Sequence, residues 1–238
     1  MKTILHKANS RGHANHGWLQ ANYSFSFANY YNPDKLHFGA LRVLNDDIIA
    51  PKMGFGTHPH DNMEIITIPI SGELKHKDSM ANEWLSVIPG EVQVMSAGSG
   101  LQHSEINGSL TSHLNLFQIW IIPNKKNVTP RYDQKHFSLE GRKDKFQTIV
   151  SSIDNDDDGL KIHQDAKISR VDISKEKTLE YKTISKNHGV YIMNVNGSIS
   201  ISNTNLNSRD AIAISNTNNF LITAKTNSEI LLIEVPML

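Results

Sequence analysis

The chain has 238 residues, of which 38% are hydrophobic and 20% are charged, and its formal charge at pH 7 is zero. This composition indicates a folded protein with one large β domain or two small ones, and it argues against a disordered chain and a direct nucleic-acid partner. Cysteine is absent, which excludes disulfides, thiolate metal sites and thiol nucleophiles. Any bound metal must therefore be held by histidine, carboxylate or other oxygen ligands.

The beginning of the chain carries only a two-residue apolar pair before His6, which is too short for the apolar region of a signal peptide. No apolar run in the sequence approaches the length that a membrane-spanning helix needs. We therefore expect a cytoplasmic protein that has no membrane partner, and we take a monomer as its expected state.

Short apolar runs bounded by glycine, proline, asparagine and aspartate dominate the chain, a pattern typical of β-sandwiches and β-barrels. The strands predicted in the first half cover residues 38–43, 63–70, 73–77, 92–95 and 114–122. The strands predicted in the second half cover residues 168–173, 190–195, 198–202, 211–215, 220–223 and 229–234. The pairs Ser71-Gly72 and Asn196-Gly197 each separate two predicted strands, and we interpret both as hairpin turns.

The two sets of strands follow the same rough plan, which predicts two related β-barrels in tandem. We place the first barrel at residues 1–125, a polar linker at 126–159 and the second barrel at 160–238. The acidic run 154–159 in the linker lacks the glutamate ligand of an EF-hand, so we interpret it as a solvated loop. Nine of the twelve histidines lie in the first 113 residues, and we expect a metal in the first barrel only.

Two short segments of the first half carry candidate metal ligands. His58 and His60 are separated by one residue, so on a strand their imidazoles face the same side. Pro59 between them lacks a backbone donor, which places this strand at a sheet edge or in an irregular stretch. A single pair of this kind is often no more than two surface histidines.

His103 and Glu105 form a second pair with the same spacing, and this pair strengthens the metal hypothesis. On facing strands of a small barrel, the two pairs give three imidazoles and one carboxylate around one point. Such ligands suit Fe(II), Mn, Ni, Cu or Zn, and four protein ligands leave two positions of a six-coordinate metal open. Glu64 is a possible fifth ligand or a solvated residue, but we favour a role in orienting a ligand imidazole.

Other notable side chains have simpler interpretations. We interpret His13 and His16 as packing or hydrogen-bonding residues, and Trp84 and Trp120 as residues of the core or of a pocket rim. Ser104 lacks an identifiable pair of a base and an orienting acid, which argues against a serine hydrolase.

At these motifs the chain resembles the pirin family of two-barrel cupins. The matching segments are residues 11–18, 25–31, 38–43, 56–60, 63–65, 76–79, 89–93, 95–100 and 103–105. The second half resembles the family in general architecture only. The resemblance implies an all-β fold of two cupin, or jelly-roll, barrels in tandem, with one divalent metal in the first barrel.

The resemblance also implies ligands and an activity. In the pirin pattern the ligands are the residues matching His58, His60, His103 and Glu105, whereas the general cupin pattern places its carboxylate at the position of Glu64. We take Fe(II) as the first choice of metal, with Ni, Cu, Mn or Zn as alternatives. Bacterial pirins of this kind are quercetin 2,3-dioxygenases, which open a flavonol with dioxygen and release carbon monoxide.

The expected reaction needs a small aromatic substrate, dioxygen and a base that removes the proton of the flavonol 3-hydroxyl. We predict Glu105 as this catalytic base, with Glu64 in reserve. Animal pirins are nuclear transcriptional cofactors. They give the alternative hypothesis of a regulatory or redox-sensing protein that uses its metal site to bind a protein partner.

Overall fold

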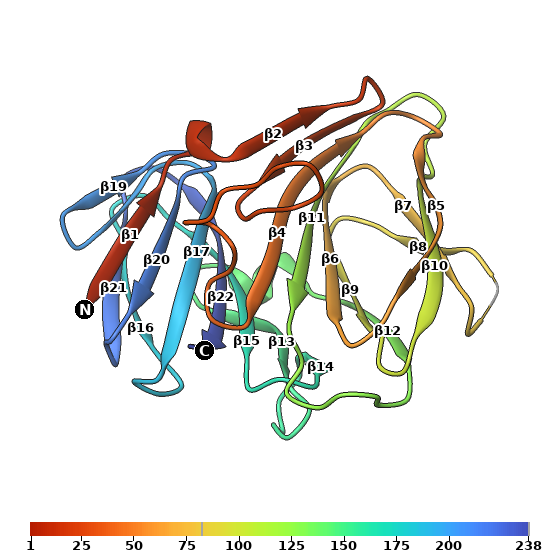
Figure 1. Cartoon of the computed structure of the whole chain (residues 1–238). Coiled ribbons are helices and arrows are strands. Elements are labelled where there is room, and N and C mark those ends of the chain that lie inside the picture. The colour runs from red at the N-terminus through yellow and green to blue at the C-terminus, as the bar shows by residue number, and fades with distance from the viewer. Residues whose placement is uncertain (82, 238) are drawn as a thin grey trace.

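A computed structural model describes residues 1–81 and 83–237 of the chain. These residues form strands and two short 3-10 helices, which together make two barrels side by side (Figure 1). The prediction of an all-β fold with two barrels is therefore confirmed.

The elements of the first barrel, in chain order, are β2 (Gly12–Asn15), β3 (Leu19–Tyr23), β4 (Leu41–Ile49), β5 (Gly54–His60), β6 (Glu64–Ser71), β7 (Leu74–Asp78), β8 (Leu85–Val87), β9 (Glu91–Ser96), β10 (Leu101–Asn107), β11 (Leu114–Ile121) and β12 (Arg131–His136). A seven-stranded sheet in the order β12-β9-β6-β11-β4-β3-β2 forms one wall of this barrel. A four-stranded sheet in the order β5-β10-β7-β8 forms the opposite wall.

The elements of the second barrel are β1 (Lys2–His6), β13 (Gln147–Ser152), β14 (Leu160–Ile162), β15 (Lys167–Ile173), β16 (Thr178–Lys182), β17 (His188–Asn196), β18 (Ile199–Ile201), β19 (Thr204–Leu206), β20 (Ala211–Ser215), β21 (Asn219–Ala224) and β22 (Ser228–Pro236). The helix η1 (Ala8–Ser10) follows β1, and η2 (Leu139–Arg142) lies between the barrels in the sequence. The larger sheet has the order β1-β20-β17-β22-β15-β13-β14, and the smaller sheet has the order β16-β21-β18-β19. Both barrels thus pair a seven-stranded sheet with a four-stranded sheet.

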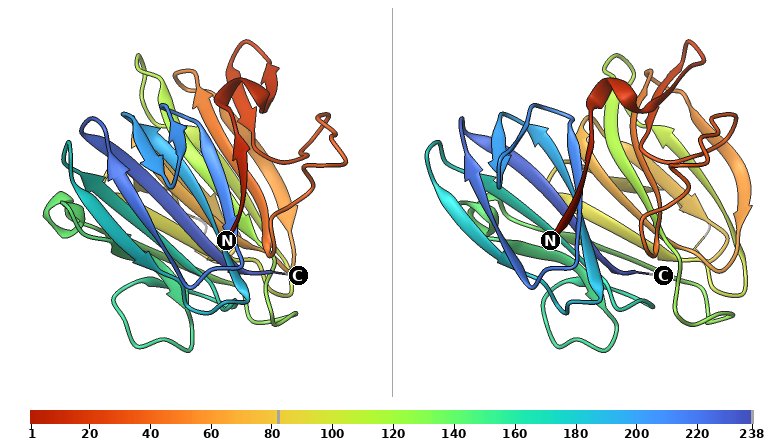
Figure 2. Two further views of the ribbon diagram at one scale, coloured as in Figure 1. Left: turned by 90° about the vertical axis from the view of Figure 1, so that its left-hand side faces the viewer. Right: turned by 60° about the vertical axis from the view of Figure 1, so that its left-hand side comes forward.

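Strand pairing adds two exceptions to the proposed division at residues 1–125, 126–159 and 160–238. The N-terminal strand β1 pairs with β20 and so completes the second barrel, beside the blue strands in Figures 1 and 2. Within the proposed linker, β12 pairs with β9 of the first barrel and β13 pairs with β15 of the second. Each barrel therefore extends into the proposed linker, and only β1 of these three strands lies in the barrel opposite to its assigned part of the sequence.

The two seven-stranded sheets pack against each other, and a large apolar core fills the space between them. On β6, Ile66 and Ile68 belong to this shared core, whereas Ile65 points into the first barrel. On β17, Tyr191 and Met193 likewise belong to the shared core. Because side chains alternate between the two faces of a strand and both faces are buried here, these strands have nearly continuous apolar sequences.

The two glycine turns change sheets instead of closing hairpins. Gly72 connects β6 to β7, but those strands lie in different sheets and do not pair with each other. Gly197 connects β17 to β18 in the same way. Their φ angles of 87° and 88° favour glycine, and an added Cβ at either position would lie 2.8 Å or less from a neighbouring strand. The hairpin interpretation was therefore wrong, although both turns and the shared plan of the two barrels are real.

The interiors of the two barrels differ. The second barrel is filled by one apolar cluster, which includes Val190, Ile192, Ile222 and Leu232. In the first barrel the buried apolar side chains form two separate clusters, one around Leu74 and Leu116 and the other around Ile65, Met95 and Leu101. This division leaves the first barrel room for polar side chains and a cavity.

No helix among the residues that the structure describes is both long enough and apolar enough for a membrane crossing.

Candidate metal centre

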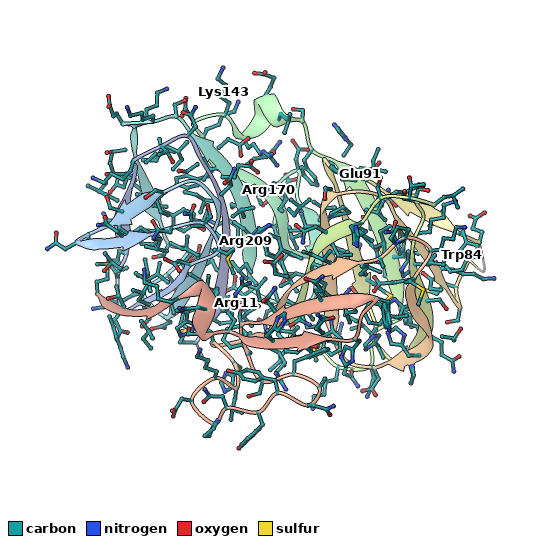
Figure 3. The ribbon with its side chains drawn as sticks, turned by 90° about the horizontal axis from the view of Figure 1, so that it is seen from above. Arg11, Trp84, Glu91, Lys143, Arg170 and Arg209 are labelled. Atoms are coloured by element: carbon teal, nitrogen blue, oxygen red, sulfur yellow. The ribbon has the colours of Figure 1, made fainter. Side chains whose placement is uncertain are left out.

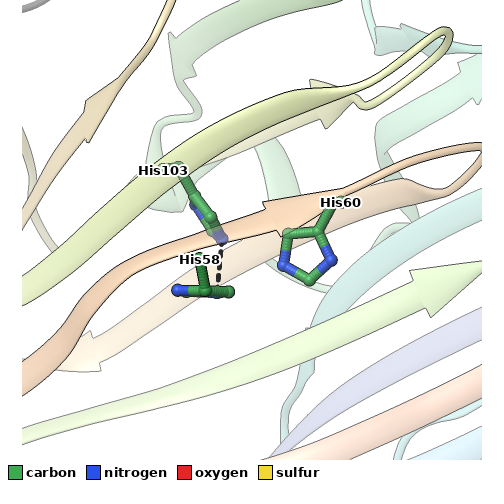
Figure 4. A group of neighbouring side chains, drawn as sticks. All are labelled: His58, His60 and His103. Atoms are coloured by element: carbon green, nitrogen blue, oxygen red, sulfur yellow. Dashed lines mark hydrogen bonds between the residues drawn. The ribbon is translucent and has the colours of Figure 1, made fainter.

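The pairing of β5 with β10 brings three imidazoles together. His58 lies directly opposite His103, and His60 lies opposite Leu101 on the same pair of strands. The Nε2 atoms of His58 and His103 are 2.9 Å apart, and the ring of His60 lies 4.9 Å from each of the other two (Figure 4). β5 is an edge strand, as Pro59 predicts, so the missing proline donor removes no bond from the sheet interior.

The hydrogen bonds of these imidazoles suit metal binding. The Nδ1 atom of His58 donates to the backbone oxygen of Gly56 at 2.8 Å, which leaves its Nε2 lone pair free to bind a metal. The Nε2 atom of His60 and the Nδ1 atom of His103 are buried and have no hydrogen-bond partner among the described residues. Two nitrogens bound to one ion at about 2.1 Å lie about 3 Å apart when they occupy adjacent positions, as the two Nε2 atoms do here.

The electrostatics of the cluster favour neutral imidazoles, which are the form that binds metals. Burial, followed by the imidazole of His58, lowers the pKa of His60 to about 4. Burial, followed by the other imidazoles, lowers the pKa of His103 to about 2. A divalent cation would compete with few protons at this site near neutral pH.

Glu105 lies beside the three-histidine cluster. A bulge between His103 and Glu105 shifts the pairing of β10 with β5, and the carboxylate groups closely with His103 and His76. Glu105 is buried, and its Oε2 atom accepts a hydrogen bond from Nε2 of Gln118 at 3.1 Å. It also lines the same cavity as His58 and His60. The structure thus brings all four predicted residues into one region, and their role as ligands stays a prediction.

His76 on β7 is a buried neighbour that the sequence analysis did not single out. Its Nε2 atom lies 3.1 Å from Oδ2 of Asp78, and its Nδ1 atom lies 3.1 Å from Nε2 of Gln93. Its ring lies 5.3 Å from that of His103. Because both ring nitrogens already have partners, His76 supports the packing of His103. The i, i+2 spacing of His76 and Asp78 was the available sequence signal.

Glu64 does not orient a ligand imidazole, so that interpretation was wrong. It begins β6, which lies in a different sheet from β5, and it shares a face with Ile66 toward the second barrel. Its carboxylate accepts a hydrogen bond from Oγ of Ser96 at 2.6 Å. Burial raises the pKa of Glu64 to about 7. The intervening residues 61–63 belong to neither strand, so the alternation of side chains along β5 does not continue to Glu64.

A cavity of about 490 Å³ opens beside the cluster. His58, His60 and Glu105 form one part of its lining, and Asn45, Asp47 and Gln118 form a polar part. Four aromatic residues complete most of the wall, and they are Trp18, Phe27, Phe55 and Trp120. This volume is typical of a small-molecule site, and the aromatic rings suit a flat organic ligand.

The aromatic wall is held in place by its own contacts. Trp18 packs edge-on against Phe55 with ring centres 5.3 Å apart, and Phe27 packs edge-on against Trp120 at 5.4 Å. Nε1 of Trp120 also donates a hydrogen bond to Gln118. Trp84, in contrast, lies 49% exposed on the outer side of the first barrel (Figure 3).

Asp47 is a buried acid of the cavity with a strongly raised pKa. Burial, with additional repulsion from Asp46 and Glu105, raises its pKa to about 8. Its Oδ1 atom is buried without a hydrogen-bond partner among the described residues. Neither this residue nor Asn45 was expected at the site from the sequence.

Comparisons with known proteins match both halves of the chain. The sequence profile of the pirin family matches residues 5–121, and that of the quercetinase C-terminal cupin domain matches residues 149–235. The quercetin 2,3-dioxygenase of Escherichia coli strain K12 is 44% identical over 233 residues, which cover 98% of each chain. The pirin-like protein of Caulobacter vibrioides is 40% identical over 223 residues, which cover 94% of this chain and 95% of that protein.

Solved structures agree with these matches. The bacterial pirin YhhW of Escherichia coli in complex with nickel(II) superposes over all of both chains with a TM-score of 0.93 and 42% identity. A quercetin 2,3-dioxygenase from Acinetobacter baumannii shares the fold, with a TM-score of 0.79 and 18% identity over 98% of this chain and 86% of that one. The expected cupin type of the barrels is confirmed.

Proposed function

The chain belongs to the pirin family, and from this membership we propose that it is a metal-dependent quercetin 2,3-dioxygenase. It cleaves a flavonol with dioxygen and releases carbon monoxide. The observation that carries the proposal is the opening of the histidine cluster and Glu105 into an aromatic cavity of about 490 Å³. An accessible cavity of this size favours a catalyst over a protein that only senses or binds a partner.

One divalent transition metal is held by His58, His60, His103 and Glu105. Fe(II) is the first choice, and Ni, Cu, Mn and Zn are alternatives, because imidazole and carboxylate ligands suit all of them. The Escherichia coli relative was solved with nickel(II). When bound, the ion supplies a Lewis acid that favours the deprotonated form of a substrate hydroxyl.

The protein's own groups orient the substrate and move its proton. The rings of Trp18, Phe55 and Trp120 pack against the flavonol and exclude water from it. A carboxylate oxygen of Glu105 accepts the proton of the 3-hydroxyl. The hydrogen bond from Gln118 holds the carboxylate toward the cavity during this step.

Two further parts of the proposal come from the sequence. We place the protein in the cytoplasm and take it to act as a monomer, with a protein partner kept as the alternative hypothesis. Size-exclusion chromatography of the metal-loaded protein tests the second point.

The test of the function begins with metal-free protein that is loaded anaerobically with one metal at a time. Quercetin is then mixed with dioxygen, and loss of its absorbance, dioxygen uptake and carbon monoxide release are measured. Glu105→Gln should lower the rate at least about a hundredfold, while the exposed control Glu140→Gln should not change it. A loaded protein that binds quercetin but neither consumes dioxygen nor releases carbon monoxide would refute the proposal.

A further inference from the structure

Two polar side chains of β4 form the part of the cavity floor that the proposed reaction leaves without a role. Asn45 and Asp47 are two residues apart and therefore face the same side of the strand. They are only 3% and 5% exposed, and both line the cavity. Asn45 lies directly opposite Gln118 on β11, the residue that bonds Glu105. The polar floor thus continues from the metal centre across two strands.

The side chains of these two residues have hydrogen-bonding capacity that is left over within the part of the chain that the structure describes. Neither Oδ1 atom has a partner among the residues described by the structure. The nearby donors are already engaged, because Gln118 donates to Glu105 and Trp120 donates to Gln118. Buried polar groups are nearly always paired, so an unpaired amide and an unpaired carboxyl at a cavity wall point to a ligand.

Asp46, between these two residues, shows how the same strand satisfies an acid that has only a structural role. Its carboxylate lies 3.2 Å from Arg11 and 3.3 Å from Arg209, and it accepts a hydrogen bond from Asn115 at 3.0 Å. The two arginines lie in the seam between the barrels (Figure 3). On the opposite face of β4, the Asp46 carboxylate therefore has three polar partners, whereas Oδ1 of Asp47, on the cavity face, has none in the described part of the chain.

The rest of the lining limits the chemistry of the ligand. Within residues 1–81 and 83–237, no lysine or arginine lines the cavity, so an anionic ligand would face two carboxyl groups without a cation beside them. The aromatic wall accepts a flat apolar skeleton. A phenolic hydroxyl is neutral and donates a hydrogen bond to a carboxylate or an amide oxygen.

We propose that Asp47 and Asn45 bind a substrate hydroxyl remote from the metal, and that they select aromatic compounds carrying at least two separated hydroxyl groups. One hydroxyl points to the histidine cluster, and the second pairs with Asp47. This inference rests on the proposed function and deepens it. It makes Asp47 a specificity-determining residue that fixes the direction in which the flat substrate enters.

The test compares two flavonols that share one skeleton. Quercetin carries several hydroxyls, whereas 3-hydroxyflavone carries only the hydroxyl intended for the metal. Binding of each to the metal-loaded protein is titrated without dioxygen, so that turnover does not interfere. Asp47→Leu, which is close in size but apolar, should weaken quercetin binding about tenfold to a hundredfold and change 3-hydroxyflavone binding less than about threefold.

Two further variants complete the design. Asp47→Asn keeps an oxygen that accepts a hydrogen bond and should restore part of the quercetin affinity. Asp158→Asn makes the same chemical change on a fully exposed side chain (103%) and should leave both affinities unchanged. Equal metal content and a single cooperative thermal transition in every variant establish that each one is folded.

Each remaining outcome separates this inference from the proposed function. Equal weakening of both flavonols by Asp47→Leu, or no weakening of either, overturns the inference even if the wild type consumes quercetin. Selective loss of quercetin binding in a protein that never consumes dioxygen supports the inference and overturns the proposed function.

Discussion

The Nε2 atom of His58 lies 2.9 Å from the Nε2 atom of His103, across the pairing of β5 with β10. Only one of two neutral imidazoles can supply the proton of a hydrogen bond between them, whereas both can bind one cation. Since the Nδ1 proton of His58 is directed at Gly56, its Nε2 atom is the acceptor. This geometry leads to the first two predictions.

Replacing a histidine of the cluster should empty the site. We expect about one metal per chain in the wild type, and at least a hundredfold loss of affinity in His103→Ala or His60→Ala, because each removes one of four ligands. Metal content after dialysis against a weak chelator measures this. His13→Ala, at an exposed position of β2, is the control. Full metal content in a His60→Ala, His103→Ala double variant would show that the ion lies elsewhere.

Metal removal should lower stability without unfolding the chain. A ligand present at a hundred times its dissociation constant stabilises the native state by about 2.7 kcal/mol. The apolar clusters that hold the barrels together contain none of the predicted ligands, so the metal-free protein should remain folded. Thermal unfolding with and without a strong chelator tests this, and the shift should vanish in His103→Ala. Complete unfolding by the chelator would contradict the prediction.

Asp47 should make the metal-free protein less stable at high pH. Its pKa is raised from 3.8 to about 8, so the native state binds more protons than the unfolded state between these values. Stability from this group is therefore present at pH 4 and is lost as the pH rises to 8, by at most about 1.4 kcal/mol per unit. Urea unfolding of wild type and Asp47→Asn at pH 5, 7 and 9 isolates the effect.

The comparison of the two proteins is essential because other groups titrate in the same range. The raised pKa of Glu64 gives a change of the same sign, and the lowered pKa of His60 gives stability that is lost on acidification. Both contributions cancel in the difference between wild type and Asp47→Asn. A difference that does not depend on pH would show that Asp47 titrates normally.

The second barrel should stabilise the fold without taking part in metal binding. Ile192 is fully buried in its single apolar cluster, so Ile192→Ala should lower the free energy of unfolding by about 2–5 kcal/mol. The metal content of the folded fraction should not change. Leu221→Ala removes a comparable side chain that is 56% exposed and should cost far less. Urea unfolding measures both, and loss of metal from folded Ile192→Ala would argue for a direct role of this barrel in the site.

The local pattern predicts only part of the histidine cluster. His58 and His60 share a strand face by their spacing alone, whereas the approach of His103 depends on the pairing of β5 with β10, in which His58 and His103 are 45 residues apart in the sequence. The position of Glu105 depends on a bulge after His103, which no alternation rule predicts. Glu64 was misplaced because the sequence does not show that the chain changes sheets after His60.

The polar floor was missed for a different reason. The predicted strand ended at residue 43, because Asn45, Asp46 and Asp47 interrupt the apolar alternation in the manner of a turn. In the structure β4 continues to Ile49, and these three residues are buried. Asp46 is stabilised there by Arg11 and Arg209, which lie far away in the sequence. Long-range pairing of this kind is not visible in a short sequence window.

The pairing of β1 with β20 also has a consequence for synthesis on the ribosome. His6 pairs with Ala211, so β1 emerges well before β20, and its strand bonds can form only after β20 has been made. Contacts between distant segments slow folding, and an unpaired strand is open to association with other chains in the meantime. The exposed side chains of Ile4 and Leu5 add apolar surface to β1 while it is unpaired. Completion of the second barrel is therefore a late event, and slow synthesis, which lengthens the time that β1 stays unpaired, should favour misassembly at this edge over errors within the first barrel.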